Sequence, residues 1–376
     1  MSIINSFARN LVNIPGWSTR RKIVVFESDD WGSIRIPSIQ TRKELIHEGF
    51  PIQHQSFNML DALESNDDLM ELFEILKKHK DATGHHPVFT AVSIVGNPDF
   101  EKIKDSNFHQ YYYEPFTETV KHYPNHDRVI DLYKQGISER LFVPIFHGRE
   151  HLNVQRWLNA LQSGNKAVRT SFDHKVTAIH IGPNYEILGD FQAAFDLDSS
   201  ADLPYMKATI SEGLDLFENL WGYKSEYFVP TNGPFNNSLE QILADKGVKY
   251  ILAERQQNEP IGDNKFKKHI HYLGMKNKLN QIYLTRNAAF EPAIVENGLN
   301  KNPIENCMKS IERAFRWGKP ATVSTHRVNY IGSLEQQNRN NNLVLLDKLL
   351  ATIIQRWPEV EFMTSVELGE LIKQSK

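Results

Sequence analysis

The sequence predicts an α/β protein with mostly parallel strands, closed into a distorted TIM-like barrel of about seven or eight β/α units. Short apolar runs rich in β-branched residues alternate with longer segments whose apolar residues recur at helical spacing. Within the 376 residues, no stretch rich in Pro, Gly or Ser marks a linker. We therefore expect a single domain over residues 1–376. An open, doubly wound sheet would give the same periodicity and remains an alternative.

Nine apolar runs are predicted to form the strands. In chain order they are 22–27, 88–95, 141–146, 176–181, 225–229, 248–253, 281–285, 321–325 and 360–364. Between them, helices are expected over segments such as 67–80, 154–162 and 343–357.

Two segments resemble insertions between these units. The first, 98–126, contains the aromatic run Tyr111 to Tyr113, for which core packing is expected rather than stacking on sugar rings. The second, 255–280, is rich in lysine and has weak periodicity. A solvated loop is expected there, rather than a binding site for an anionic polymer.

Composition and charge exclude several classes of protein. Apolar residues make up 40% and charged residues 24% of the chain, as in globular domains. The net charge of −3 gives no general attraction to nucleic acid or anionic lipid. The one cysteine, Cys307, cannot form an internal disulfide. Since there is neither a signal-peptide core nor an apolar run of roughly 18 residues, we expect a cytoplasmic protein without a membrane span.

Polar clusters follow four of the predicted strands directly. The C-terminal ends of parallel strands meet at one rim of a barrel, where barrel enzymes keep their catalytic groups. We therefore expect one site built from these clusters. They are Asp29 with Asp30 after 22–27, His147 after 141–146, the segment PTNG (230–233) after 225–229, and His326 after 321–325.

The spacing of two histidines indicates a metal site. His147 and His151 are four residues apart, so on a helix both imidazoles would share one face and could bind one ion. Consecutive side chains of an extended segment diverge. Asp30 would thus complete a His-His-Asp site while Asp29 stands beside it as a proton acceptor. The alternatives are an acidic turn open to water and histidines with structural roles.

With these residues, the chain resembles the polysaccharide deacetylase superfamily (NodB-like, carbohydrate esterase family 4), whose fold is a distorted β/α barrel. The family's first motif pairs a catalytic Asp with a metal-binding Asp, as in Asp29-Asp30. Its second motif has two histidines at the spacing of His147 and His151. The segment FVPTNG (228–233) follows the third motif loosely, and His326 corresponds to the histidine of the last motif.

The chain departs from the family pattern in three places. Gly148 stands where a Ser or Thr is expected, and Val229 replaces the Arg that orients the catalytic base. Arg35, Arg149 or Arg286 could substitute for that Arg, and the sequence does not choose among them. The Asp that tunes the acidic histidine has no recognisable counterpart.

The resemblance implies a metal-dependent hydrolase that removes acetyl groups from an N- or O-acetylated sugar or polysaccharide. A divalent cation would be held by Asp30, His147 and His151; Zn²⁺ is expected, with Co²⁺, Ni²⁺ and Mn²⁺ as alternatives. Asp29 would act as base and His326 as acid. Trp31 and Asn232 would lie near the sugar, although packing beneath the barrel mouth is an equal alternative for Trp31.

Two other functions stay open. The stretch HGREH also fits the H-x-x-E-H pattern of inverted zinc peptidases, in which Glu150 would activate water. Those enzymes carry the motif on a long helix, whereas here it follows the apolar run LFVPIF. A carbohydrate-binding protein that has lost catalysis is the other possibility, motivated by the missing Arg. The sequence leaves the identity of the substrate and the oligomeric state open.

Overall fold

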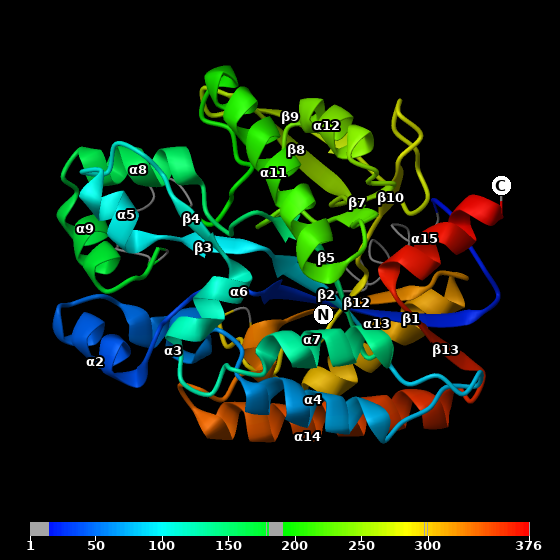
Figure 1. Ribbon diagram of the computed structural model, residues 1–376. Coiled ribbons are helices and arrows are strands. Elements are labelled where there is room, and N and C mark those ends of the chain that lie inside the picture. Colours follow the sequence, from blue (N-terminus) through cyan, green and yellow to red (C-terminus); the bar gives the residue numbers. More distant parts are fainter. Residues whose placement is uncertain (1–14, 178, 180–190, 297, 299, 376) are drawn as a thin grey trace.

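The centre of the protein is a nine-stranded sheet (Figure 1). The computed structural model describes residues 15–177, 179, 191–296, 298 and 300–375. The strands are β1 (Lys22–Trp31), β2 (Phe89–Ile94), β5 (Phe142–Gly148), β6 (Tyr227–Phe228), β7 (Tyr250–Leu252), β10 (Ile282–Leu284), β11 (Ala288–Ala289), β12 (Ala321–His326) and β13 (Val360–Met363). All pairs in this sheet are parallel, which confirms the predicted α/β class.

The sheet curls on itself. Its order is β10-β7-β6-β5-β2-β1-β12-β11, with β13 paired to β1. Only residues 285–287 join β10 at one edge to β11 at the other. Four Cα–Cα steps span at most roughly 15 Å, so the two edges must lie near each other. Within the described residues these edges do not pair, and the barrel is therefore distorted and open along this seam.

Helices cover the outside of the curled sheet (Figure 1). Those packed around it are α4 (Asn66–Lys77), α7 (Val129–Ser138), α11 (Leu203–Trp221), α12 (Glu240–Asp245), α13 (Pro303–Arg316), α14 (Gln336–Arg356) and α15 (Ser365–Gln374). Shorter helices lie beyond the C-terminal ends of the strands or between units: α2 (Ile39–His47), α3 (Ser56–Leu60), α5 (Phe100–Asp105), α6 (Phe116–Thr119), α8 (Val154–Gln162) and α9 (Lys166–Asp173).

Alternation along β1 separates two apolar clusters. Val24 and Phe26 belong to the large cluster that includes the outer helices. Ile23 and Val25 belong to the inner cluster, which contains Leu368 and Ile372 of α15. Since successive side chains of a strand point to opposite faces, Glu27 and then Asp29 continue the inner row. The interior of the curl thus changes from apolar to acidic toward the C-terminal end of β1.

Most of the predicted strands are confirmed. Eight of the nine expected runs overlap a strand of the central sheet. The ninth, 176–181, falls partly on residues outside the described part. The lysine-rich segment 255–280 is not the expected loop, because β8 (Gln256–Gly262) and β9 (Lys265–Ile270) form an antiparallel hairpin there. The segment 98–126 includes α5, α6 and β4 (Tyr113–Pro115), which pairs with β3 (Gly96–Pro98).

The described helices include none with the length and apolar character needed to span a lipid bilayer.

Candidate active site

The end of β1 turns two consecutive carboxylates toward the same cavity. The pairing of β1 with β2 shifts register between Ser28 and Trp31, as in a β-bulge. Asp30 has φ +79, a left-handed conformation that is rare outside glycine, asparagine and aspartate. Because this backbone breaks the alternation, Asp29 and Asp30 both line one cavity of about 460 Å³.

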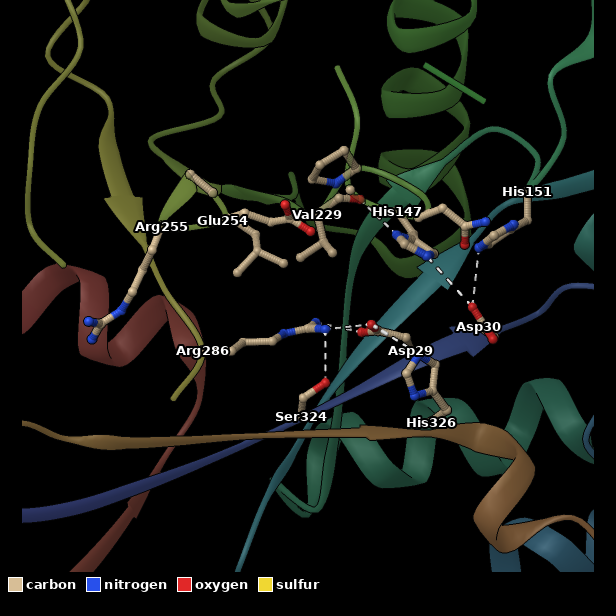
Figure 2. A pocket seen from close by; sticks show the side chains of 15 residues that line it. Asp29, Asp30, His147, His151, Val229, Glu254, Arg255, Arg286, Ser324 and His326 are labelled. Carbon is tan, nitrogen blue, oxygen red and sulfur yellow. Dashed lines mark hydrogen bonds and ion pairs between the residues drawn. The ribbon is translucent and has the colours of Figure 1, made fainter. Parts of the chain in front are cut away.

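Asp30 meets the two histidines (Figure 2). Its Oδ1 lies 3.8 Å from Nε2 of His147 and 3.2 Å from Nε2 of His151. All three donor atoms lie within 4.8 Å of one another, and all three side chains are buried. Among the described residues this is the one group of three such side chains that could hold a metal ion.

The two histidines converge from a strand end and a bend, not from one face of a helix. His147 is part of β5, and residues 149–152 form a bend. The pairing of β5 with β2 also shifts register at this point. Gly148 has φ +154, and a Cβ there would lie 3.0 Å from the carbonyl oxygen of Glu150. This close approach favours a glycine at position 148, where the resemblance implied a Ser or Thr.

The donors fit a divalent cation with nitrogen and oxygen ligands. The Nδ1 atom of His147 donates to the carbonyl oxygen of Val229 at 2.7 Å, which leaves the Nε2 lone pair for a metal. Burial lowers the pKa of His151 and favours the neutral ring that metal binding requires. Burial alone would raise the pKa of Asp30, but the two neighbouring histidine rings outweigh it and hold that pKa well below its usual value. Nδ1 of His151 has no partner in the described part of the chain, so its tautomer is not fixed.

Arg286 holds Asp29 (Figure 2). Its two terminal nitrogens each donate to one oxygen of Asp29 at 2.6 Å, and its Nε donates to Glu27. Burial opposes ionisation of Asp29, but the guanidinium outweighs it and lowers the pKa of that carboxyl. Glu27 is fully buried and also accepts hydrogen bonds from Tyr227 and Ser365. Of the three candidate arginines, Arg286 is therefore the one that orients Asp29.

His326 lies opposite Asp29. The two residues are partners in the register of β1 and β12, and Nε2 of His326 is 3.9 Å from Oδ2 of Asp29. The Nδ1 atom of His326 donates to Glu291 at 2.7 Å, and Glu291 accepts a second bond from Asn329. Burial disfavours the imidazolium, but Glu291 outweighs it and raises the pKa of His326 to about 10.

The other wall of the cavity comes from β6, β7 and the segments that follow them. Pro230, Asn232 and Gly233 line it, so the structure brings Asn232 to the site as expected. Ser324 of β12 and Glu254 after β7 complete the rim. Val229 contributes through its backbone, since its carbonyl orients His147.

Trp31 does not reach this cavity. Its side chain is fully buried, and its indole nitrogen donates to Ser28 at 2.9 Å. Its ring packs edge-on against Phe142 at a centroid distance of 4.8 Å. The expectation that Trp31 contacts the sugar is therefore wrong, because the bulge turns its side chain into the core beneath the rim.

Glu150 also points away from the cavity. Arg149 donates to both of its carboxylate oxygens, at 2.6 and 3.1 Å, and Glu150 lies in a separate crevice with Tyr205 and Met206. The Arg149 guanidinium packs over the rings of Tyr113 and Tyr111, at 4.4 and 5.5 Å from their centroids. The expectation that these tyrosines pack rather than face a ligand agrees with this contact. Glu150 is not placed to activate water at the histidines.

Sequence reasoning missed Glu27 and Glu291. Both residues follow from features of the sequence: Glu27 is an acid at the end of the apolar run of a predicted strand, and a buried acid requires a partner. Arg286 and Glu291 lie in the stretch TRNAAFE directly after the predicted strand 281–285. Strand 281–285 thus contributes a fifth polar cluster to the rim.

Comparisons with known proteins reveal distant structural similarity. No protein-family model and no curated protein sequence matches this chain. A probable polysaccharide deacetylase from Pseudomonas aeruginosa is 10% identical, with 93% of this chain and 91% of that chain covered and a TM-score of 0.47. Puue allantoinase is 12% identical, with 94% of this chain and 91% of that chain covered and a TM-score of 0.46. A CE4 family pseudoenzyme from Bacillus anthracis is 11% identical, with 94% of this chain and 67% of that chain covered and a TM-score of 0.41. With TM-scores below 0.5, these similarities carry no conclusion about the chemistry, which rests on the geometry above.

Proposed function

We propose that this chain is a divergent polysaccharide deacetylase, a metal-dependent hydrolase that removes acetyl groups from an acetylated sugar or polysaccharide. One observation carries the proposal. A buried Asp-His-His triad, an arginine-held carboxylate and a histidine held by Glu291 line the same cavity, contributed by strands far apart in the sequence. The chain order of these residues, which follows the motifs of that superfamily, supports it.

Each residue has a distinct role in this proposal. Asp30, His147 and His151 would hold the divalent cation. When bound, a metal such as Zn²⁺ would supply Lewis acidity and lower the pKa of a coordinated water. Asp29 is ionised at neutral pH, because its pKa is lowered, and can accept a proton from the attacking water. Arg286 fixes the direction of that carboxylate through two parallel hydrogen bonds.

His326 would deliver the second proton. The water oxygen forms a bond to the acetyl carbon, the bond from that carbon to the sugar nitrogen or oxygen breaks, and the leaving atom takes a proton from Nε2 of His326. A pKa raised to about 10 keeps this imidazole protonated at neutral pH. Glu291 holds Nδ1, so that Nε2 is the atom directed toward Asp29 and the cavity. The products are acetate and a free amine or hydroxyl.

Acetate release tests the proposal directly. Protein loaded with Zn²⁺ is incubated with acetylated chitooligosaccharides, peptidoglycan fragments and lipid-linked or nucleotide-linked N-acetyl sugars. We expect release from at least one of them, reduced by roughly 10²-fold or more in Asp29→Asn because the base is removed. Glu150→Gln serves as the control and should retain activity. In a peptidase of the H-x-x-E-H type, Glu150→Gln would instead abolish activity and Asp29→Asn would largely keep it. Binding of a sugar without release of acetate from any substrate would instead identify an inactive binding protein.

A further inference from the structure

The hairpin formed by β8 and β9 exposes an unusual combination of apolar and basic side chains. Four of the ten exposed large hydrophobic residues of the described chain lie within 12 positions on it: Ile261, Phe266, Ile270 and Tyr272. Ile270 is 73% and Phe266 55% exposed. Residues 255–280 carry six basic and two acidic side chains, a net charge of +4 against −3 for the whole chain. The hairpin is thus a cationic and apolar projection from an acidic protein.

The two faces of the hairpin differ. Gln257 and Glu259 of β8 are buried. Gln257 donates to the carbonyl oxygen of Phe235 at 3.1 Å, and Glu259 accepts from the N–H of Asn237 at 2.9 Å, so this face packs on the protein. Alternation then directs Phe266, Lys268 and Ile270 to the opposite face, and Tyr272 continues the row with 40% exposure. The outward face therefore presents Phe266, Lys268, Ile270 and Tyr272 in one row.

The lysines of β9 are available to an external anion. Lys268 lies in the outward row, whereas Lys265 and Lys267 share the face of Glu259 but are exposed to solvent as well. Of these three lysines, only Lys265 has a carboxylate of a described residue within 4.0 Å of its Nζ, that of Asp263 at 3.8 Å. β9 pairs with β8 alone in the described part of the chain, so its outer edge is open. A second copy of the same strand would bring lysines against lysines, which disfavours pairing between two copies.

We propose that the β8–β9 hairpin docks the protein on an anionic lipid surface. Lysines attract phosphate headgroups, whereas exposed isoleucine and phenylalanine side chains gain from burial at the boundary of the acyl chains. A hydrated anionic polysaccharide would satisfy the lysines but offers no apolar environment to Ile261 and Ile270. The lipid surface is the partner that accounts for both kinds of side chain.

The position of the hairpin makes this surface adjacent to the catalytic cavity. β8 begins at Gln256, immediately after Glu254 and Arg255, which line that cavity. Asp263, in the turn of the hairpin, bonds through its N–H to the carbonyl of Asp198, which fastens the tip to the segment before α11. Docking would therefore hold a rigid wall of the cavity against the lipid. The binding step is independent of the proposed hydrolysis and is measured without it.

Flotation of the full chain with vesicles tests the proposal. We expect the protein to float with vesicles of phosphatidylcholine and phosphatidylglycerol but not with phosphatidylcholine alone, and to be released by raised salt. Each lysine near an anionic surface contributes roughly a fivefold factor to partitioning. The triple variant Lys265→Gln, Lys267→Gln, Lys268→Gln should therefore partition roughly a hundredfold less. A second variant, Phe266→Ser with Ile270→Ser, should partition onto the vesicles at least about tenfold less than the wild type.

A matched control is available on α14, on the opposite side of the molecule (Figure 1). Val344 is 66% exposed and Lys348 is exposed there, and the variant Val344→Ser with Lys348→Gln should float like the wild type. Absence of flotation with anionic vesicles overturns the proposal, as does equal flotation of the hairpin variants. Hairpin-dependent binding of soluble polygalacturonate in place of vesicles would overturn it in favour of an anionic glycan.

Discussion

Two buried carboxylates share one guanidinium at the centre of the site. Glu27 and Asp29 both bind Arg286 and are both largely shielded from water. An isolated buried charge costs several kcal/mol, so each group here depends on its partners. Under the proposed function, Arg286 would orient Asp29 in place of the Arg that the resemblance implies at the position of Val229.

Glu291 sets the proton affinity of His326, and its removal should be visible in the pH profile. With Glu291 in place, the pKa of His326 is raised from 6.5 to about 10. A histidine that acts as acid is active below its pKa, so activity falls as pH rises through that value. In Glu291→Gln the pKa should fall toward 6.5, and the alkaline limb of kcat/KM should move to lower pH. The profile is measured with the substrate that releases acetate.

The control for this variant is Glu296→Gln. Glu296 binds Ser56 rather than His326, so its loss should leave the alkaline limb in place. The raised pKa also predicts a stability effect, since protonation of His326 stabilises the folded state fully below pH 6.5 and this contribution is lost as pH rises toward 10. An unchanged alkaline limb in Glu291→Gln would show that His326 is not the titrating acid.

The sequence predicted the residues that lie in short motifs and missed those that act across the sheet. Asp29, Asp30, His147 and His326 follow apolar runs, and His151 is found by its spacing from His147; the structure brings all five to one cavity. Arg286 could not be chosen over Arg35 and Arg149, because the choice depends on the curl of the sheet. Contact with the sugar and packing beneath the rim stayed equal alternatives for Trp31, because the bulge that turns its side chain into the core leaves no mark in the sequence pattern.

At the scale of elements, two bulges place the metal ligands. β1 shifts register beside Asp30 and β5 shifts beside His147. A regular strand would send Asp29 and Asp30 to opposite faces. Sequence periodicity predicts regular strands and helices, which is why the strand ends were found but the bend that brings His151 beside His147 was not. Local irregularities are set by tertiary contacts that periodicity does not contain.

The turn after Asp30 should be sensitive to an added methyl group at Gly32. Gly32 has φ +81, and a Cβ there would lie 2.9 Å from the carbonyl oxygen of Ile94. Gly84 has a similar φ of +86, with nothing within 4 Å of a Cβ. Gly84→Ala should cost about 1 kcal/mol from backbone strain alone. Gly32→Ala should cost roughly 2–4 kcal/mol because the clash adds to that strain. Urea unfolding of both variants measures the difference, and equal losses would exclude the close approach.

At the scale of the whole molecule, the seam of the sheet builds the site. The link of residues 285–287 between the two edges of the sheet carries Arg286 across to β1. The predicted barrel accounts for the convergence of strand ends, but not for this short crossing, because β11 has only two residues and no recognisable apolar run. α15 closes the other end of the curl with Leu368 and Ile372. The apolar end of the curl is thus filled by α15, and the cavity lies at the rim that carries the polar residues.

A metal shared by β1 and β5 should stabilise the whole fold. A ligand at a hundredfold excess over its Kd contributes about 2.7 kcal/mol to the free energy of unfolding. For 376 residues this corresponds to a Tm increase of roughly 3 °C, which a chelator should remove. His151→Gln should abolish the increase, because a ligand is lost. Asp29→Asn should keep it while losing acetate release, since Asp29 is bound by Arg286 and lies outside the triad. Thermal unfolding with and without Zn²⁺ therefore separates the ligands from the base, and a shift lost in Asp29→Asn but kept in His151→Gln would reverse the assignment.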